Sequence, residues 1–177
     1  MSYIEWFNSH CVKLIQWLSY LQERTVMSVF NRHTVNCPPF GRLKYGSAHW
    51  LGEVELGAFE GMLRVIVRAK RDGPTDAQIA AMTRLLSDVA TIKTLASKAM
   101  VDVFADCELL PSDFGSDVHH IWQYLSPCEI EVSDENYFGG GDNRINIMII
   151  FESPQHLDFF PAIVTIDGYF EECVSGT

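Results

Sequence analysis

The sequence predicts an α+β domain: a mostly antiparallel sheet of about six strands, one long helix packed on one face, and an N-terminal helical arm. Short apolar segments typical of strands lie on both sides of one long segment with helical periodicity, without strict βαβ alternation. Of the 177 residues, 47% are hydrophobic and 20% are charged, which is enough for one sizeable core. We therefore expect a single globular domain behind the arm.

The N-terminal segment has the pattern of an amphipathic helix. Apolar residues recur at three- and four-residue intervals over residues 4–21. Pro38 and Pro39 then interrupt helix and strand alike. We therefore expect residues 1–39 to be a helical arm with its linker, and residues 40–177 to be the single α+β domain.

Strands are expected on both sides of the long helix, three before it and three or four after it. Leu63, Val65 and Val67 alternate with residues that include two arginines, a period of two that is typical of a strand. Asp167 and Gly168 form a turn dipeptide that suits a tight hairpin. The predicted strands are 41–45, 50–56, 62–69, 128–133, 144–152, 162–167 and 169–174.

Two helices are predicted between these groups of strands. Thr75 stands three residues before Gln78, the arrangement of a capping box, and apolar residues then follow a 3.6-residue period for about seven turns, to Phe104. A second, short helix is expected over residues 117–125, with Ser116 as its cap.

Charge is distributed unevenly along the chain. Residues 1–100 contain 12 basic and 8 acidic residues, whereas residues 101–177 contain 15 acidic residues and one basic residue, Arg144. The second part therefore has a net charge of −14 within a total of −10. Such a segment repels nucleic acid and anionic lipid, so we expect neither as a partner. It attracts basic protein surfaces, although it also fits a role in solubility alone.

The sequence favours a cytoplasmic protein without a cofactor. The first twenty residues lack a basic leader and a small-residue cleavage site, and no apolar stretch approaches the length of a membrane helix. The five cysteines are widely spaced without a C-x-x-C pair, which favours reduced thiols over disulfides or zinc ligands.

Candidate catalytic groups are few. His119 and His120 are adjacent, so on a helix they point about 100° apart and are poorly placed to share a metal ion. Neighbouring serines lack a G-x-S-x-G elbow, and the glycines at 139–141 are flanked by acids that repel phosphate. We predict no catalytic residue and no metal ligand. A small metal-dependent hydrolase using His119, His120, Asp113 or His156 remains an alternative.

Several short segments suggest a family. They are Trp50 before a strand, residues 74–78 (PTDAQ) opening the long helix, residues 153–156 (SPQH) and residues 163–170 (IVTIDGYF). Over residues 40–174 the chain resembles small bacterial α+β domains, some of which are similar to immunity proteins that neutralise polymorphic or secreted toxins. In those domains an acid and a histidine precede the closing hairpin. Gln155 replaces the acid beside His156 here, so we carry no site over from the resemblance.

We therefore predict a cytosolic, non-enzymatic binding protein of the immunity class, whose acidic C-terminal half occludes a basic active site in a cognate toxin. A homo-oligomeric assembly protein, paired through the helix that carries Trp6 and Trp17, is a further alternative. The expected partner-binding residues are Asp113, Asp117, Asp134, Glu135, Asp142, Glu171 and Glu172, with Tyr137 and Phe138 as aromatic anchors.

Overall fold

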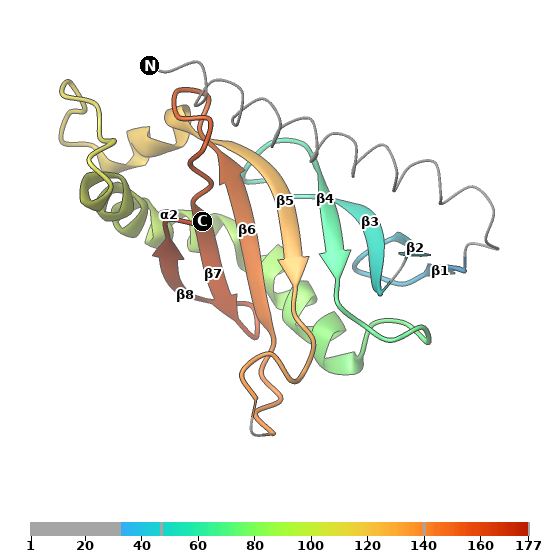
Figure 1. Ribbon diagram of the computed structural model, residues 1–177. Coiled ribbons are helices and arrows are strands. Elements are labelled where there is room, and N and C mark those ends of the chain that lie inside the picture. The colour runs from blue at the N-terminus through green and yellow to red at the C-terminus, as the bar shows by residue number, and fades with distance from the viewer. Residues whose placement is uncertain (1–32, 47, 140, 177) are drawn as a thin grey trace, which may run out of the picture. The chain divides into compact units, whose positions relative to one another are not determined.

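The computed structural model describes residues 33–46, 48–139 and 141–176, of which residues from Thr34 onward belong to one compact unit. These residues form one sheet of eight strands whose spatial order follows the chain, with the long helix α2 behind it (Figure 1). The elements are β1 (Thr34–Asn36), β2 (Arg42–Gly46), β3 (His49–Glu55), β4 (Met62–Val67), α2 (Asp76–Asp106), the 3₁₀ helix η1 (Val118–Tyr124), β5 (Ser126–Val132), β6 (Asn146–Glu152), β7 (Ala162–Ile166) and β8 (Tyr169–Val174).

The predicted class is confirmed: the domain is α+β, its sheet is mostly antiparallel, and it has one long helix. The strand count is higher than the expected six or so. Strand β1 lies in the segment assigned to the linker and pairs with β2 through Val35 and Leu43. With three residues it is too short for an alternating pattern to reveal it. The predicted N-terminal helix lies outside the described residues.

One pair of neighbouring strands breaks the antiparallel pattern. Strands β4 and β5 are parallel, with Val65 opposite Ile130 and Val67 opposite Val132. All other neighbouring strands of the described sheet are antiparallel. A parallel pair needs a long crossover, and α2 followed by η1 supplies it. Figure 1 shows β4 and β5 pointing toward the end of the sheet where α2 begins.

Side chains on the α2 side of the sheet form the core. The predicted period of two in β4 is confirmed, because Leu63, Val65 and Val67 are buried while Arg64 is exposed. Helix α2 contributes a stripe at helical spacing that includes Met82, Leu85, Val89, Ile92, Ala96, Met100 and Phe104. Burial of this stripe is what holds an amphipathic helix against a sheet.

Ion pairs join the two parallel strands on the other side of the sheet. Arg64 Nε lies 3.2 Å from Glu129 Oε2, and Arg68 pairs with Glu131. Partial burial raises the pKa of Glu129, against the opposing effect of Arg64. Because the arginine side chains are about half exposed, these ion pairs add little to the stability of the fold. Their main effect is to favour the observed register of β4 and β5.

The N-terminus of α2 is tied to the ends of both parallel strands by one side chain. The predicted capping box is present: Gln78 N donates to Thr75 Oγ1 (3.3 Å) and Thr75 N donates to Gln78 Oε1 (2.9 Å). The Gln78 amide nitrogen also donates to the carbonyls of Arg68 (3.1 Å) and Ser133 (2.7 Å). Gln78 is fully buried, so its amide group holds the start of the crossover in place.

The short helix differs from its prediction in cap and type. It is a 3₁₀ helix, and its N-cap is Asp117, whose side chain accepts from His119 N at 2.9 Å, rather than Ser116. The Asp117 carboxylate accepts from the backbone N–H two residues later, so Asp117 takes the N-cap role that was predicted for Ser116.

The predicted turn at Asp167 and Gly168 is confirmed and packs on α2. Both residues have positive φ (53° and 84°), which fits a tight turn between β7 and β8. A Cβ on Gly168 would lie 2.3 Å from Ala81 O. Asp167 Oδ1 accepts from Ile145 N at 2.8 Å, so the turn also holds the start of β6.

Removing the Gln78 side chain should destabilise the fold more than removing its cap partner. Gln78→Ala leaves the carbonyls of Arg68 and Ser133 without this donor and should lower the free energy of unfolding by about 2–4 kcal/mol. Thr75→Ala removes one cap bond and should cost about 1 kcal/mol. Urea unfolding of both variants checks the order, and equal losses would show that the strand-end bonds contribute nothing.

Gly168→Ala should destabilise the protein by about 2 kcal/mol or more, because the new methyl group meets the α2 backbone at a residue with φ of 84°. The matched control is Gly57→Ala, where a Cβ meets nothing within 4 Å, and it should stay within about 0.5 kcal/mol of the parent. Thermal unfolding of both proteins provides the comparison.

Candidate partner-binding surface

Five of the nine predicted partner-binding residues lie together on the loop between β5 and β6. They are Asp134, Glu135, Tyr137, Phe138 and Asp142, within residues 133–145, which we call the acidic loop. The loop extends from the end of the sheet at which β5 ends, as Figure 1 shows. The structure thus brings the predicted aromatic anchors next to three of the predicted carboxylates.

Local hydrogen bonds fold the acidic loop back on itself. Asp134 Oδ1 accepts from Asn136 N at 2.8 Å, a turn typical of aspartate, and Gly139 N donates to Asn136 O at 2.9 Å. Gly139 and Gly141 adopt φ of 70° and 80°, which glycine tolerates without strain. Gly139 and Gly141 therefore suit the turns of this loop.

Two aromatic rings are exposed on the acidic loop. Tyr137 is 53% and Phe138 is 40% exposed, and their ring centroids lie 5.0 Å apart in an edge-to-face arrangement. The Arg144 guanidinium lies 4.9 Å from the centroid of the Phe138 ring. The rings support one another while remaining open to solvent, which suits anchor residues of a protein interface.

Arg144 is neutralised inside the acidic loop. Its Nε and Nη2 donate to the Asp142 carboxylate at 2.7–3.0 Å. This pairing lowers the pKa of Asp142 and raises the pKa of Arg144, to which Asp167 and Glu171 also contribute. Asp142 therefore stays ionised, and its contribution to stability is lost only as the pH falls through its depressed folded-state pKa. Asp134 and Glu135 make no ion pair among the described residues, so the net charge presented is negative.

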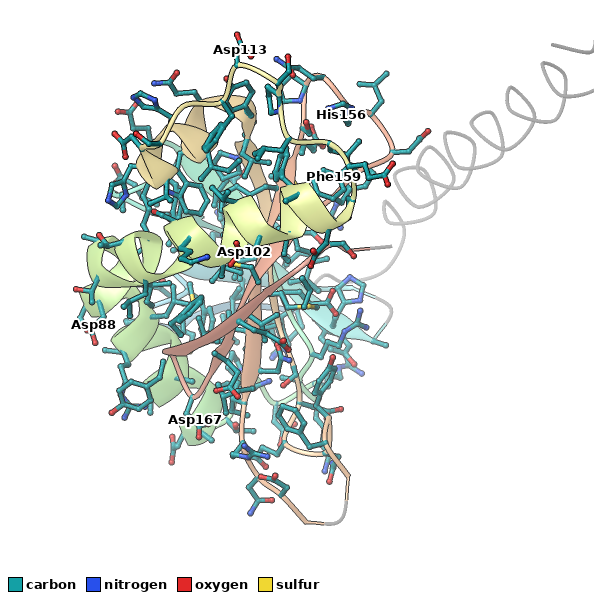
Figure 2. All side chains as sticks on the ribbon, turned by 90° about the vertical axis from the view of Figure 1, so that its left-hand side faces the viewer. Asp88, Asp102, Asp113, His156, Phe159 and Asp167 are labelled. Carbon is teal, nitrogen blue, oxygen red and sulfur yellow. The ribbon has the colours of Figure 1, made fainter. Side chains whose placement is uncertain are left out.

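The other four predicted residues lie elsewhere. Glu171 and Glu172 are exposed on β8, and Glu171 is close enough to Arg144 to raise its pKa. Asp113 and Asp117 precede η1, at the end of the domain opposite the acidic loop. Figure 2 shows Asp113 and Asp167 at opposite ends, and Asp167 is bonded to the end of the acidic loop. Six of the nine residues, the five on the acidic loop and Glu171, are therefore candidates for one surface.

Sequence reasoning missed Arg144 as the organiser of this surface. It bonds Asp142 and covers Phe138, so it sets the direction of both the carboxylate and the ring. Its position as the one basic residue after residue 100, two residues beyond Asp142, was the signal that could have identified it.

His119, one of the histidines proposed for hydrolysis, contacts a buried serine. His119 Nδ1 lies 3.0 Å from Ser97 Oγ, to which Trp122 Nε1 donates at 2.9 Å. Ser97 is fully buried in α2, and its hydroxyl donates to Lys93 O at 2.9 Å. The Ser97 hydroxyl therefore connects η1 to α2. Because its proton is donated to the helix backbone, this hydroxyl is poorly placed to attack a substrate.

The remaining candidate groups lie toward one end of the domain but on separate, exposed segments. His120 lies 3.7 Å from Asp117, and both side chains are more than half exposed. His156 lies in the β6–β7 loop, at the same end as Asp113 (Figure 2). Across residues 33–46, 48–139 and 141–176, no three His, Cys, Asp or Glu side chains are grouped so that they could hold a metal ion.

Comparisons with known proteins found no matching family model, no matching curated protein and no matching solved structure. The resemblance to toxin-immunity proteins therefore stays a prediction. Among the described residues, no helix combines the length and the apolar character needed to cross a bilayer.

Two cysteines should react slowly with alkylating agents. Burial is the main factor that raises the pKa of Cys128 to about 11 and of Cys173 to about 12. At pH 8 the thiolate forms are rare, so in the folded protein iodoacetamide should modify Cys128 about 100-fold and Cys173 about 1000-fold more slowly than in urea. Peptide mass spectrometry over time measures each ratio, and rapid labelling of either residue in folded protein would contradict the assigned burial.

Proposed function

We propose that this protein is a cytosolic, non-enzymatic binding protein of the immunity class, which docks on a basic partner such as a cognate toxin. The observation that carries the proposal is the exposed Tyr137–Phe138 pair on a loop whose unpaired charges are carboxylates. Aromatic residues dominate binding energy at interfaces, and surrounding charges select the partner and speed its approach.

The distribution of charge supports a basic partner. Asp134, Glu135, Glu171 and Glu172 make no ion pair among the described residues, and Arg144 is held by Asp142. Such a surface attracts a positively charged active-site cleft over about a Debye length, roughly 8–10 Å at ordinary ionic strength. Occlusion of the cleft would then follow from burial of the two aromatic rings.

The two alternatives have less support from the described residues. The hydrolase alternative relies on His119, His120, Asp113 or His156, which lie beside a buried serine, on an exposed surface or in separate loops. The homo-oligomer alternative depends on the helix with Trp6 and Trp17, which lies outside the described residues. We therefore keep binding to a basic protein as the proposed function.

The proposal predicts a salt-sensitive partner. Affinity capture of the tagged protein from its native cells should retain one basic protein in stoichiometric amount and release it at high salt. With that protein purified, Tyr137→Ala/Phe138→Ala should weaken binding by about 2 kcal/mol or more, roughly thirtyfold, because the anchors are lost. Isothermal titration calorimetry measures the change.

Charge reversal provides a separate test with a matched control. Asp134→Lys/Glu135→Lys should slow association and reduce its dependence on salt. Asp88→Lys/Asp106→Lys changes the net charge equally at exposed positions of α2 and should have little effect on association. Equal effects of the two double variants, or capture of no partner by the parent protein, would remove the proposed function.

A further inference from the structure

A pocket of about 570 Å³ lies at the end of the sheet where the two parallel strands end. Its walls come from three places: the segment after β4, the segment after β5, and the β2–β3 hairpin. The C-terminal ends of neighbouring parallel strands, beside the start of a crossover helix, are the usual location of ligand sites in α/β sheets. The volume is in the range of small-molecule sites.

The base of the pocket is rigid. Gln78 lines it, and the amide group of this buried residue is bonded to Thr75 and to the ends of β4 and β5. The aromatic wall is Tyr45, whose ring lies 5.1 Å from the ring of buried Trp50. Trp50 Nε1 donates in turn to Lys70 O at 2.8 Å, which fixes the segment after β4. The lining is thus preformed by bonds that do not require a ligand.

Charged side chains of both signs line neighbouring walls of the pocket. Arg68, Lys70 and Asp72 follow β4, whereas Asp134 and Glu135 follow β5. The strands are in register at Val67 and Val132, so the two charged segments leave the sheet side by side. Even so, no ion pair joins the two walls among the residues that the structure describes. Arg68 is engaged by Glu131, and the Lys70 ammonium makes no ion pair in the same set.

We propose that this pocket binds a small zwitterionic ligand of the amino-acid or short-peptide class. The ligand's ammonium group faces Asp134 and Glu135, its carboxylate faces Lys70, and its side chain contacts Tyr45. A ligand with both charges satisfies the separated walls at once, whereas a ligand with a single charge leaves one wall unpaired. The inference goes beyond the proposed function, because the pocket can bind a small molecule whether or not a basic protein binds the acidic loop.

Three related probes test the charge requirement. The dipeptide Ala-Ala carries both charges. Its C-terminal amide carries only the positive charge, and its N-acetyl form carries only the negative charge. Titration of the full chain with Ala-Ala should shift the backbone amide NMR signals of Gly73 and Asn136 until the shifts saturate. The affinity for Ala-Ala should be at least about tenfold higher than for either analogue. Shifts that do not saturate by about 10 mM, or equal affinities for the three probes, overturn the proposal.

Variants assign each charge to its wall. Lys70→Gln should remove the preference for Ala-Ala over its amide, and Glu135→Gln should reduce the preference for Ala-Ala over its N-acetyl form. Arg71→Gln is the control, because Arg71 is exposed and is not part of the pocket lining. Loss of binding in the control as well would overturn the assignment. These titrations use no protein partner, so they succeed or fail independently of the capture experiment.

Discussion

The architecture depends on the hydrogen bonds of one buried amide group. Strands β4 and β5 can run parallel because α2 and η1 carry the chain from the end of β4 back to the end of the sheet at which β4 begins. Gln78 fixes the point at which this crossover starts. A glutamine can accept from the helix cap and donate twice at the same time, which neither glutamate nor an apolar residue can do. The residue therefore couples helix capping to strand pairing, two events far apart in the sequence.

This constraint separates the two ends of the sheet chemically. At one end, the segments after β4 and β5 carry the charged pocket and the acidic loop, so both candidate sites lie near the anchored start of α2. At the other end, η1 packs through Trp122 and Ser97 onto α2, and aromatic contacts join Phe59, Trp122 and Phe151. The first end carries the pocket and the acidic loop, whereas at the second end η1 extends the core under an exposed surface that includes Asp117 and His120.

Features set by neighbouring residues could be predicted from the sequence. The capping box, the alternation in β4 and the Asp167–Gly168 turn depend on residues within four positions of each other, and all three are present. The parallel pairing of β4 with β5 could not be predicted, because it joins Val65 to Ile130 and leaves no local pattern. The same limit applies to the candidate surface. Tyr137 and Phe138 could be singled out as anchors, but the distance of Asp113 from them depends on the crossover.

The edge strands of the described sheet, β1 and β8, affect how other proteins can approach it. Strand β1 is only three residues long and is followed, after Cys37, by Pro38 and Pro39, which offer no N–H for pairing. On the opposite edge, β8 presents Glu171 and Glu172 and meets β7 at an irregular register between Val164 and Thr165. Short length, proline, charge and irregularity all discourage the addition of a foreign strand. Recognition should therefore occur through side chains at the ends of the strands rather than by extension of the sheet, and the folded domain should resist edge-to-edge aggregation.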